Sequence, residues 1–151
     1  MNLSNIIRPE HTFIGLSVTT KWRALQTISE KAGKAFGIDG QSVLKALESR
    51  EKLGSTGIGN GIAVPHAAID GMTSPRGLLI RFAQPLDFDA IDDIATDIAF
   101  VLLFGENNRG EYLNVLAAIA RRLQSDGVLA AMRKAKSTDE FYSDFIADSR
   151  V

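Results

Sequence analysis

Residues 54–66 read GSTGIGNGIAVPH and form the most distinctive segment of the chain. Its first eight residues contain four glycines together with Ser55, Thr56 and Asn60, too many backbone-permissive residues for a helix or a regular strand. We therefore predict a loop over residues 54–61. The apolar residues 62–64 predict a short strand, so His66 is expected at a strand end.

The composition of this loop suits an anion. Glycines let backbone N–H groups turn toward a phosphate oxygen, and the hydroxyls of Ser55 or Thr56 can donate hydrogen bonds as well. His66 is the strong nucleophile nearby, because a neutral imidazole with an ordinary pKa of about 6.5 can attack phosphorus without an added base. The segment therefore predicts phosphate chemistry at His66.

Strands and helices alternate on both sides of the segment. Strands are predicted at 12–18, 77–83 and 97–104, and the last is apolar almost throughout, which is typical of the centre of a sheet. Between the last two, residues 84–93 form a connection with Pro85 and four aspartates. Helices are predicted over 21–36, 39–51, 110–124, 126–134 and from Ser137, which forms a capping box with Glu140. The alternation predicts an α/β fold with a single mixed or parallel β-sheet and helices packed on both faces.

Apolar residues at three- and four-residue steps predict the buried side of each helix. In helix 21–36 these are Trp22, Leu25, Ile28, Ala32 and Ala35, and in helix 110–124 they are Leu113, Leu116, Ala120 and Leu123.

The overall composition limits the functional classes. A length of 151 residues with 45% hydrophobic residues predicts a single domain over 1–151. Lys plus Arg (17) nearly balances Asp plus Glu (18), so no overall charge favours nucleic acid or an anionic membrane. The chain has no cysteine, no signal-peptide pattern and no apolar run near the roughly 20 residues of a membrane span. We expect a cytoplasmic protein without membrane insertion, whose partner is a protein or a small molecule.

The usual nucleotide, metal and hydrolase motifs fit poorly. The glycines at 57, 59 and 61 precede a strand instead of opening a helix, unlike a dinucleotide fingerprint, and the chain lacks the Gly-Lys-[Ser/Thr] of a P-loop. With two histidines and no cysteine there is no recognisable zinc spacing, and no Gly-x-Ser-x-Gly elbow is present. We therefore expect no metal and no cofactor.

Residues 50–66, REKLGSTGIGNGIAVPH, resemble the active-site signature of the enzyme IIA domains of the bacterial phosphoenolpyruvate-dependent phosphotransferase system, fructose/mannitol class. Within that class the chain is most similar to the nitrogen-regulatory IIA proteins. The resemblance includes residues 85–92 (PLDFDAID), the strand 98–104 and the helix 113–123. It implies the mannitol/fructose-type IIA fold, with a single mixed β-sheet, over nearly the whole chain.

The resemblance also implies roles for individual residues. His66 matches the phosphoacceptor of the family, which receives a phosphoryl group from an HPr-type phosphocarrier protein, and Arg50 matches a basic residue near the phosphohistidine. Tyr112 stands where family members usually carry a second active-site histidine. A phenol can donate a hydrogen bond but does not readily exchange protons near neutral pH. We predict His66 as the catalytic residue of a phosphotransferase, with Arg50, Ser55, Thr56 and Tyr112 as phosphate-binding or supporting residues.

Several functional alternatives remain open at this level. The leading interpretation is a phosphoryl carrier that regulates nitrogen or ion metabolism through its phosphorylation state. A sugar-transport IIA subunit that donates phosphate to a IIB partner is the first alternative, and a non-phosphorylated regulatory binding module is the second. His66 as a purely structural histidine is the least specific alternative. Ile58, Ile69 and Met72 are predicted, from their proximity in sequence, to form the docking patch for the donor protein.

Overall fold

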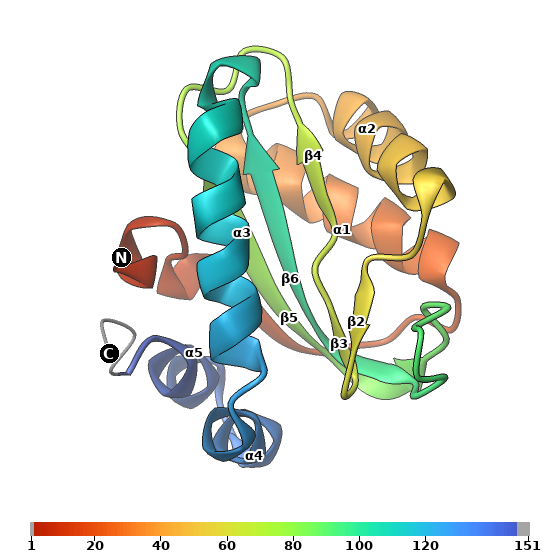
Figure 1. Cartoon of the computed structure of the whole chain (residues 1–151), viewed down its shortest axis with the longest axis vertical. Helices are drawn as coiled ribbons and strands as arrows, with labels where there is room; N and C mark the ends of the chain where they lie inside the picture. Colours follow the sequence, from red (N-terminus) through yellow and green to blue (C-terminus); the bar gives the residue numbers. More distant parts are fainter. Residues whose placement is uncertain (1, 148–151) are drawn as a thin grey trace.

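A computed structural model describes residues 2–147 (Figure 1). Residues 1 and 148–151 of the predicted domain lie outside the described residues. The described chain contains one six-stranded sheet with the order β1-β5-β6-β3-β2, and β4 also pairs with β6. The strands are β1 (Thr12–Leu16), β2 (Gly57–Gly59), β3 (Ile62–Ala63), β4 (His66–Ala68), β5 (Arg76–Leu86) and β6 (Thr96–Phe104).

The sheet is mixed, as predicted. β1 runs parallel to β5, β5 runs antiparallel to β6, and both β3 and β4 run parallel to β6. β6 therefore lies at the centre of the sheet, as its apolar sequence predicts.

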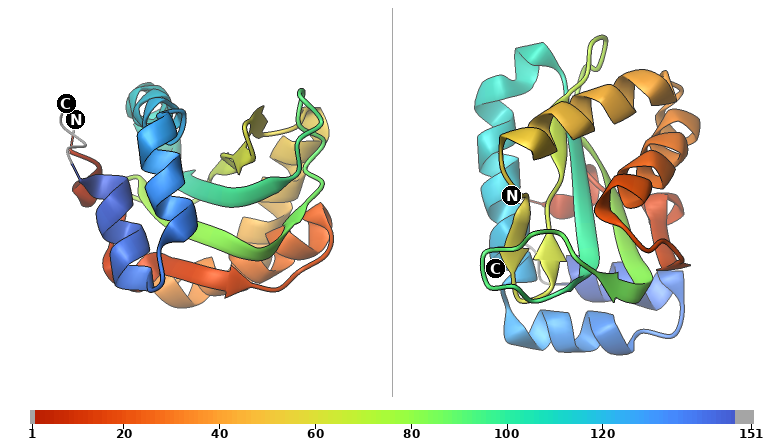
Figure 2. Two further views of the ribbon diagram at one scale, coloured as in Figure 1. Left: turned by 90° about the horizontal axis from the view of Figure 1, so that it is seen from below. Right: turned by 90° about the vertical axis from the view of Figure 1, so that its right-hand side faces the viewer.

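Helices cover both faces of the sheet (Figures 1 and 2). They are α1 (Lys21–Phe36), α2 (Gly40–Leu53), α3 (Arg109–Leu123), α4 (Asp126–Lys134) and α5 (Thr138–Ile146). Three short 3₁₀ turns, η1 (Leu3–Asn5), η2 (Pro9–His11) and η3 (Glu106–Asn108), complete the described elements. All five helices were expected from the sequence, and Asp39 and Ser137 cap α2 and α5 through their side chains.

Alternation along β6 explains the two hydrophobic cores. Ile98, Phe100, Leu102 and Phe104 pack with α3, α4 and α5, whereas Ala99, Val101 and Leu103 pack with α1 and α2. Since successive strand residues point to opposite faces, a strand covered on both sides has to be apolar throughout. The predicted α/β fold with helices on both faces is confirmed.

The predicted buried faces of two helices are partly wrong. Trp22 was expected in the core but is 42% exposed, because Lys21 turns inward at the start of α1 and Trp22 lies about 100° further around the helix. In α3 the buried residues are Val115, Ile119 and Leu123, whereas Leu113 is 57% exposed. Of the apolar residues predicted to be buried in this helix, only Leu123 is fully buried, and the others lie at the edge of the core or are exposed.

The glycine-rich segment is more regular than predicted. Residues 57–59 form β2, which pairs antiparallel with β3. Asn60 and Gly61 make the turn between them with φ angles of 57° and 81°, a left-handed conformation that asparagine and glycine tolerate best. Pairing with β3 therefore overrides the low strand propensity of glycine, and the prediction of an irregular loop over 54–61 is wrong for 57–59. The strand β4 was not predicted.

No helix within residues 2–147 combines the length and the apolar composition needed to cross a membrane.

Candidate functional site at His66

His66 is the first residue of β4, where the chain leaves Pro65 and pairs with the central strand. It lies opposite Leu102 of β6, and the carbonyl of Pro65 accepts a hydrogen bond of 2.9 Å from the Leu102 amide. The backbone of His66 is therefore fixed by the centre of the sheet, and its side chain is half-buried. The prediction that a strand end presents His66 is close, since the strand ends at Ala63 and a new one begins at His66 itself.

Both ring nitrogens of His66 have a partner. Nδ1 lies 2.8 Å from the carbonyl oxygen of Val64, and Nε2 accepts a hydrogen bond of 3.3 Å from Nε of Arg50. Because a carbonyl can only accept, Nδ1 carries the hydrogen and the lone pair is on Nε2. The geometry selects the neutral tautomer with Nε2 as the nucleophilic atom.

The surroundings also favour the neutral ring. Burial lowers the pKa of His66 below its ordinary value of 6.5, and the charge of Arg50 lowers it further. The hydrogen bond to Val64 and the charge of Glu51 act in the opposite direction, but the net shift is downward. A neutral imidazole is the form that can attack an electrophile.

Arg50 lies in the last turn of α2. Its Nη1 donates a hydrogen bond of 2.9 Å to the carbonyl of Gly54, so the guanidinium is anchored to the start of the loop while its Nε faces His66. The sequence prediction that Arg50 lies beside His66 agrees with this arrangement. A guanidinium held in this position is suited to an anion that arrives at Nε2.

The hydroxyls of Ser55 and Thr56 are engaged elsewhere in this structure. Ser55 Oγ donates to the carbonyl of Phe88 and accepts a bond of 3.0 Å from the Gly57 amide. Thr56 Oγ1 donates to Glu51 at 2.6 Å, and the Thr56 amide donates to the same carboxylate at 2.9 Å. Both residues line the hollow beside His66, yet their hydrogens hold the loop in place, and a role in binding phosphate stays a prediction.

Tyr112 approaches the site from α3. Its ring centroid lies 6.3 Å from that of His66 with an angle of 28° between the planes. The structure thus brings Tyr112 to the imidazole, as expected for a residue that matches the position of a second site histidine.

A hollow of about 370 Å³ opens beside His66, between the glycine-rich segment and α3. Leu113, Leu116, Ala117 and Ala120 form its wall on α3, and Ile58 lines it from β2. Of the three predicted docking residues only Ile58 lines this hollow. Ile69 is buried and Met72 packs against the core on the α1–α2 face of the sheet, so sequence proximity misled for these two.

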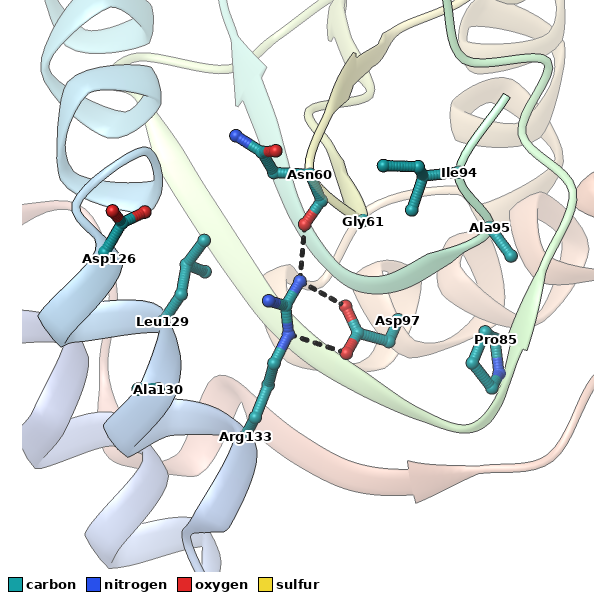
Figure 3. Close-up of a pocket in the computed structure, with 10 residues that line it drawn as sticks. All are labelled: Asn60, Gly61, Pro85, Ile94, Ala95, Asp97, Asp126, Leu129, Ala130 and Arg133. Carbon is teal, nitrogen blue, oxygen red and sulfur yellow. Dashed lines mark hydrogen bonds and ion pairs between the residues drawn. The ribbon is translucent and has the colours of Figure 1, made fainter. Parts of the chain in front are cut away.

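The far end of the glycine-rich segment is fastened separately. Arg133 of α4 donates to both oxygens of Asp97, at 2.8 and 2.9 Å, and to the carbonyl of Asn60 (Figure 3). The Asn60 amide donates to Asp92 at 2.9 Å. Asn60, Asp97 and Arg133 border a second hollow of about 430 Å³. The turn at Asn60 is therefore held from two sides, by contacts that do not involve His66.

Sequence reasoning missed three contributors to the site. The Val64 carbonyl is a backbone group without a sequence signal. In the sequence, Glu51 looks like an ordinary charged residue at a helix end, although its side chain is buried. The apolar residues on the exposed side of α3 have the pattern of a buried helix face. Within residues 2–147 no three His, Asp or Glu side chains gather in a way that could hold a metal ion.

Residues 5–148 match the protein family described as "Phosphoenolpyruvate-dependent sugar phosphotransferase system, EIIA 2". The chain belongs to this EIIA 2 family. A relative in Klebsiella oxytoca, named nitrogen regulatory protein, is 38% identical over 143 residues, which cover 94% of this chain and 88% of the relative. Members of the EIIA 2 family are components of a phosphotransferase system, as their description states.

Solved structures agree with the assignment to the EIIA 2 family. The nitrogen regulatory protein IIA-Ntr from Neisseria meningitidis superimposes with a TM-score of 0.89 at 29% identity, covering 95% of this chain and 98% of that one. The mannitol IIA protein of Escherichia coli gives a TM-score of 0.77 at 21% identity, covering 91% of this chain and 97% of that one. The second likeness concerns the fold alone and confirms the mannitol-type architecture.

Proposed function

We propose that this protein carries a phosphoryl group on Nε2 of His66, which it accepts from the phosphohistidine of an HPr-type phosphocarrier protein. The observation that carries the proposal is the state of the ring: Nδ1–H is bonded to the carbonyl of Val64, and Nε2 accepts a hydrogen bond from Arg50 at the edge of the hollow that His66 lines. Membership of the EIIA 2 family supports the same chemistry.

The transfer needs no added base. The lone pair of His66 Nε2 forms the new N–P bond as the P–N bond of the donor breaks, and the electron pair of that bond returns to the donor ring. The Nδ1 hydrogen stays in its bond to Val64 throughout. Arg50 first has to leave the Nε2 lone pair, and its anchor at Gly54 keeps its charge next to the incoming phosphoryl oxygens.

The remaining phosphoryl oxygens also need hydrogen-bond donors. The hydroxyl of Tyr112 on α3 is one such donor. The hydroxyls of Ser55 and Thr56 are two more, although each would first have to give up its present hydrogen bond. The apolar wall of α3, with Ile58, is the surface on which the donor protein docks. Docking there also excludes water from the transfer, which strengthens each electrostatic contact.

Two downstream roles for the phosphoryl group are suggested by the relatives of this chain. Proteins named nitrogen regulatory protein match nearly the full length of the chain, which supports a carrier whose phosphorylation state regulates nitrogen or ion metabolism by changing what it binds. The family description names a sugar phosphotransferase system, which favours donation to a IIB partner as the second candidate. Chase of the labelled protein with a IIB domain separates the two, because only a transport subunit should lose its label.

The primary test is phosphorylation with phosphoenolpyruvate, enzyme I and an HPr-type protein. One acid-labile phosphoryl group should appear by intact mass, persist in His11→Ala and be absent in His66→Ala. Label on His11, or label that persists in His66→Ala, would contradict the assignment of the site.

A further inference from the structure

Glu51 is a buried acid beneath the site, and the chemistry described above does not use it. Its side chain is 1% exposed, at the end of α2 next to Arg50. A buried carboxylate is costly unless it is paired and hydrogen-bonded. Here Lys21 of α1 donates to Glu51 Oε2 at 3.1 Å, and Lys21 also pairs with Asp89 at 2.8 Å. Although burial alone would lower it, these hydrogen bonds raise the pKa of Lys21.

A continuous series of hydrogen bonds leads from Glu51 to one nitrogen of His66. The Glu51 carboxylate accepts from both the amide and the hydroxyl of Thr56. The carbonyl of Thr56 accepts from the Val64 amide at 2.9 Å, and the Val64 carbonyl accepts from His66 Nδ1 at 2.8 Å. The Glu51 carboxylate thereby holds Thr56 in place, and Thr56 in turn holds Val64, whose carbonyl is the partner of Nδ1.

A second route leads to the other nitrogen. Arg50 precedes Glu51 in the chain, and its Nε donates to His66 Nε2. With Glu51 held inward by Lys21 and Thr56, the adjacent residue in the last turn of α2 is directed outward to the loop and the imidazole. Glu51 is therefore linked to the partner of Nδ1 by hydrogen bonds and to the partner of Nε2 by its position next to Arg50 in the chain.

We infer that Glu51 is the positioning residue of the site, which sets the tautomer and the orientation of His66 through Thr56 and Val64 on one side and Arg50 on the other. Lys21 makes the buried carboxylate tolerable, and Asp89 fastens Lys21 to the segment that follows β5. The inference rests on the proposed function, because the ring is positioned for phosphoryl transfer.

The first test reads the ring itself, without any phosphorelay. The charged and titratable groups that face His66 are Arg50, Glu51 and Tyr112. In Glu51→Gln, ¹⁵N-edited NMR of the imidazole should show loss of the pure Nδ1–H tautomer and an acid titration shifted to lower pH, since Glu51 raises the pKa of His66. His11 is the internal control and should titrate as in the wild type.

A matched variant separates positioning from general stability. Asp97→Asn breaks the ion pair of Arg133 at the far end of the same hairpin and should leave the tautomer and titration of His66 unchanged. If Glu51→Gln does not fold, Lys21→Met combined with Glu51→Gln removes both buried charges together, so that neither is left buried without its partner, and the same NMR measurements apply. A folded variant of either kind with the wild-type tautomer and titration would overturn the inference.

The second test is kinetic. Glu51→Gln should lower kcat for acceptance roughly tenfold, because a misplaced nucleophile loses its alignment, with the KM for the donor protein unchanged. An increased KM with unchanged kcat would assign Glu51 to docking and contradict positioning. If the wild type takes up no phosphoryl group, the proposed function fails, whereas the NMR test still decides the role of Glu51.

Discussion

The ring of Tyr112 lies flat on the ring of Phe104, with centroids 3.9 Å apart and an angle of 1° between the planes. Phe104 is the last residue of β6 and is buried, so it anchors Tyr112 to the core. The ring of Tyr112 also neighbours that of His66, with the centroids 6.3 Å apart. The orientation of the phenol beside the site is thus set by packing.

Replacement of Tyr112 should change the phosphorylated state and not the fold. Tyr112→Phe keeps the stacked ring and removes one neutral hydrogen bond of about 1 kcal/mol, so the lifetime of the phosphohistidine should fall several-fold. Tyr112→His adds a group that titrates near neutral pH and should alter the transfer rate by a similar factor. Rapid-quench assays measure both, and equal rates and lifetimes in all three proteins would make Tyr112 a packing residue only.

The pH dependence of acceptance should follow His66. Burial and the charge of Arg50 lower the pKa of His66, so the imidazole should stay neutral at pH values somewhat below 6.5. The acid limb of the rate profile should therefore have its midpoint below pH 6.5. Arg50→Gln should move the midpoint upward. A wild-type midpoint above 6.5 would contradict this environment.

The same pKa shifts predict a decrease in stability in acid. The pKa values of both His66 and His11 are lowered, chiefly by burial, so between pH 6.5 and the folded pKa values the unfolded chain binds more protons. The free energy of unfolding should therefore fall as the pH drops through this window. Urea titrations across the range measure the effect, and the double variant His11→Gln and His66→Gln should lose that part of the slope.

Arg50 should matter for rate more than for stability. Arg50→Lys cannot reach both His66 Nε2 and the Gly54 carbonyl with one ammonium in the same geometry, so acceptance should slow by roughly tenfold. Its site is partly exposed, and the free energy of unfolding should change by less than about 1 kcal/mol. Arg23→Lys, on the exposed side of α1, is the control and should transfer at the wild-type rate.

Leu113 should contribute to docking of the donor protein. It is exposed on the apolar wall of the hollow, and Leu113→Ser should raise the KM for the HPr-type protein by roughly five- to tenfold without loss of kcat. Leu53→Ser is a matched control, since Leu53 is also exposed but does not line the hollow. Equal effects of the two substitutions would remove the docking surface from α3.

Local patterns predicted much of this fold and a smaller part of its site. The helix ranges and the central position of β6 follow from periodicity and from the apolar run, which are properties of short segments. The inward turn of Lys21 depends on Glu51, 30 residues away, and on Asp89. No local pattern contains that pairing, so periodicity alone predicts Trp22 in the core. For α3 the apolar stripe is wider than the face that the sheet covers, and the sequence does not say which part stays exposed.

The groups that meet the two nitrogens of His66 come from one short stretch of chain, residues 50–66, whereas Tyr112 and the apolar wall come from α3. In the proposed function, the reacting nitrogen and its supports therefore belong to one segment, whereas the docking surface belongs mostly to another, with Ile58 as the exception. Under that proposal, substitutions along the exposed side of α3 should change which partner protein binds while His66 and its hydrogen-bond partners stay intact. This division would let the contacts of the proposed carrier diversify while the chemistry at His66 stays the same.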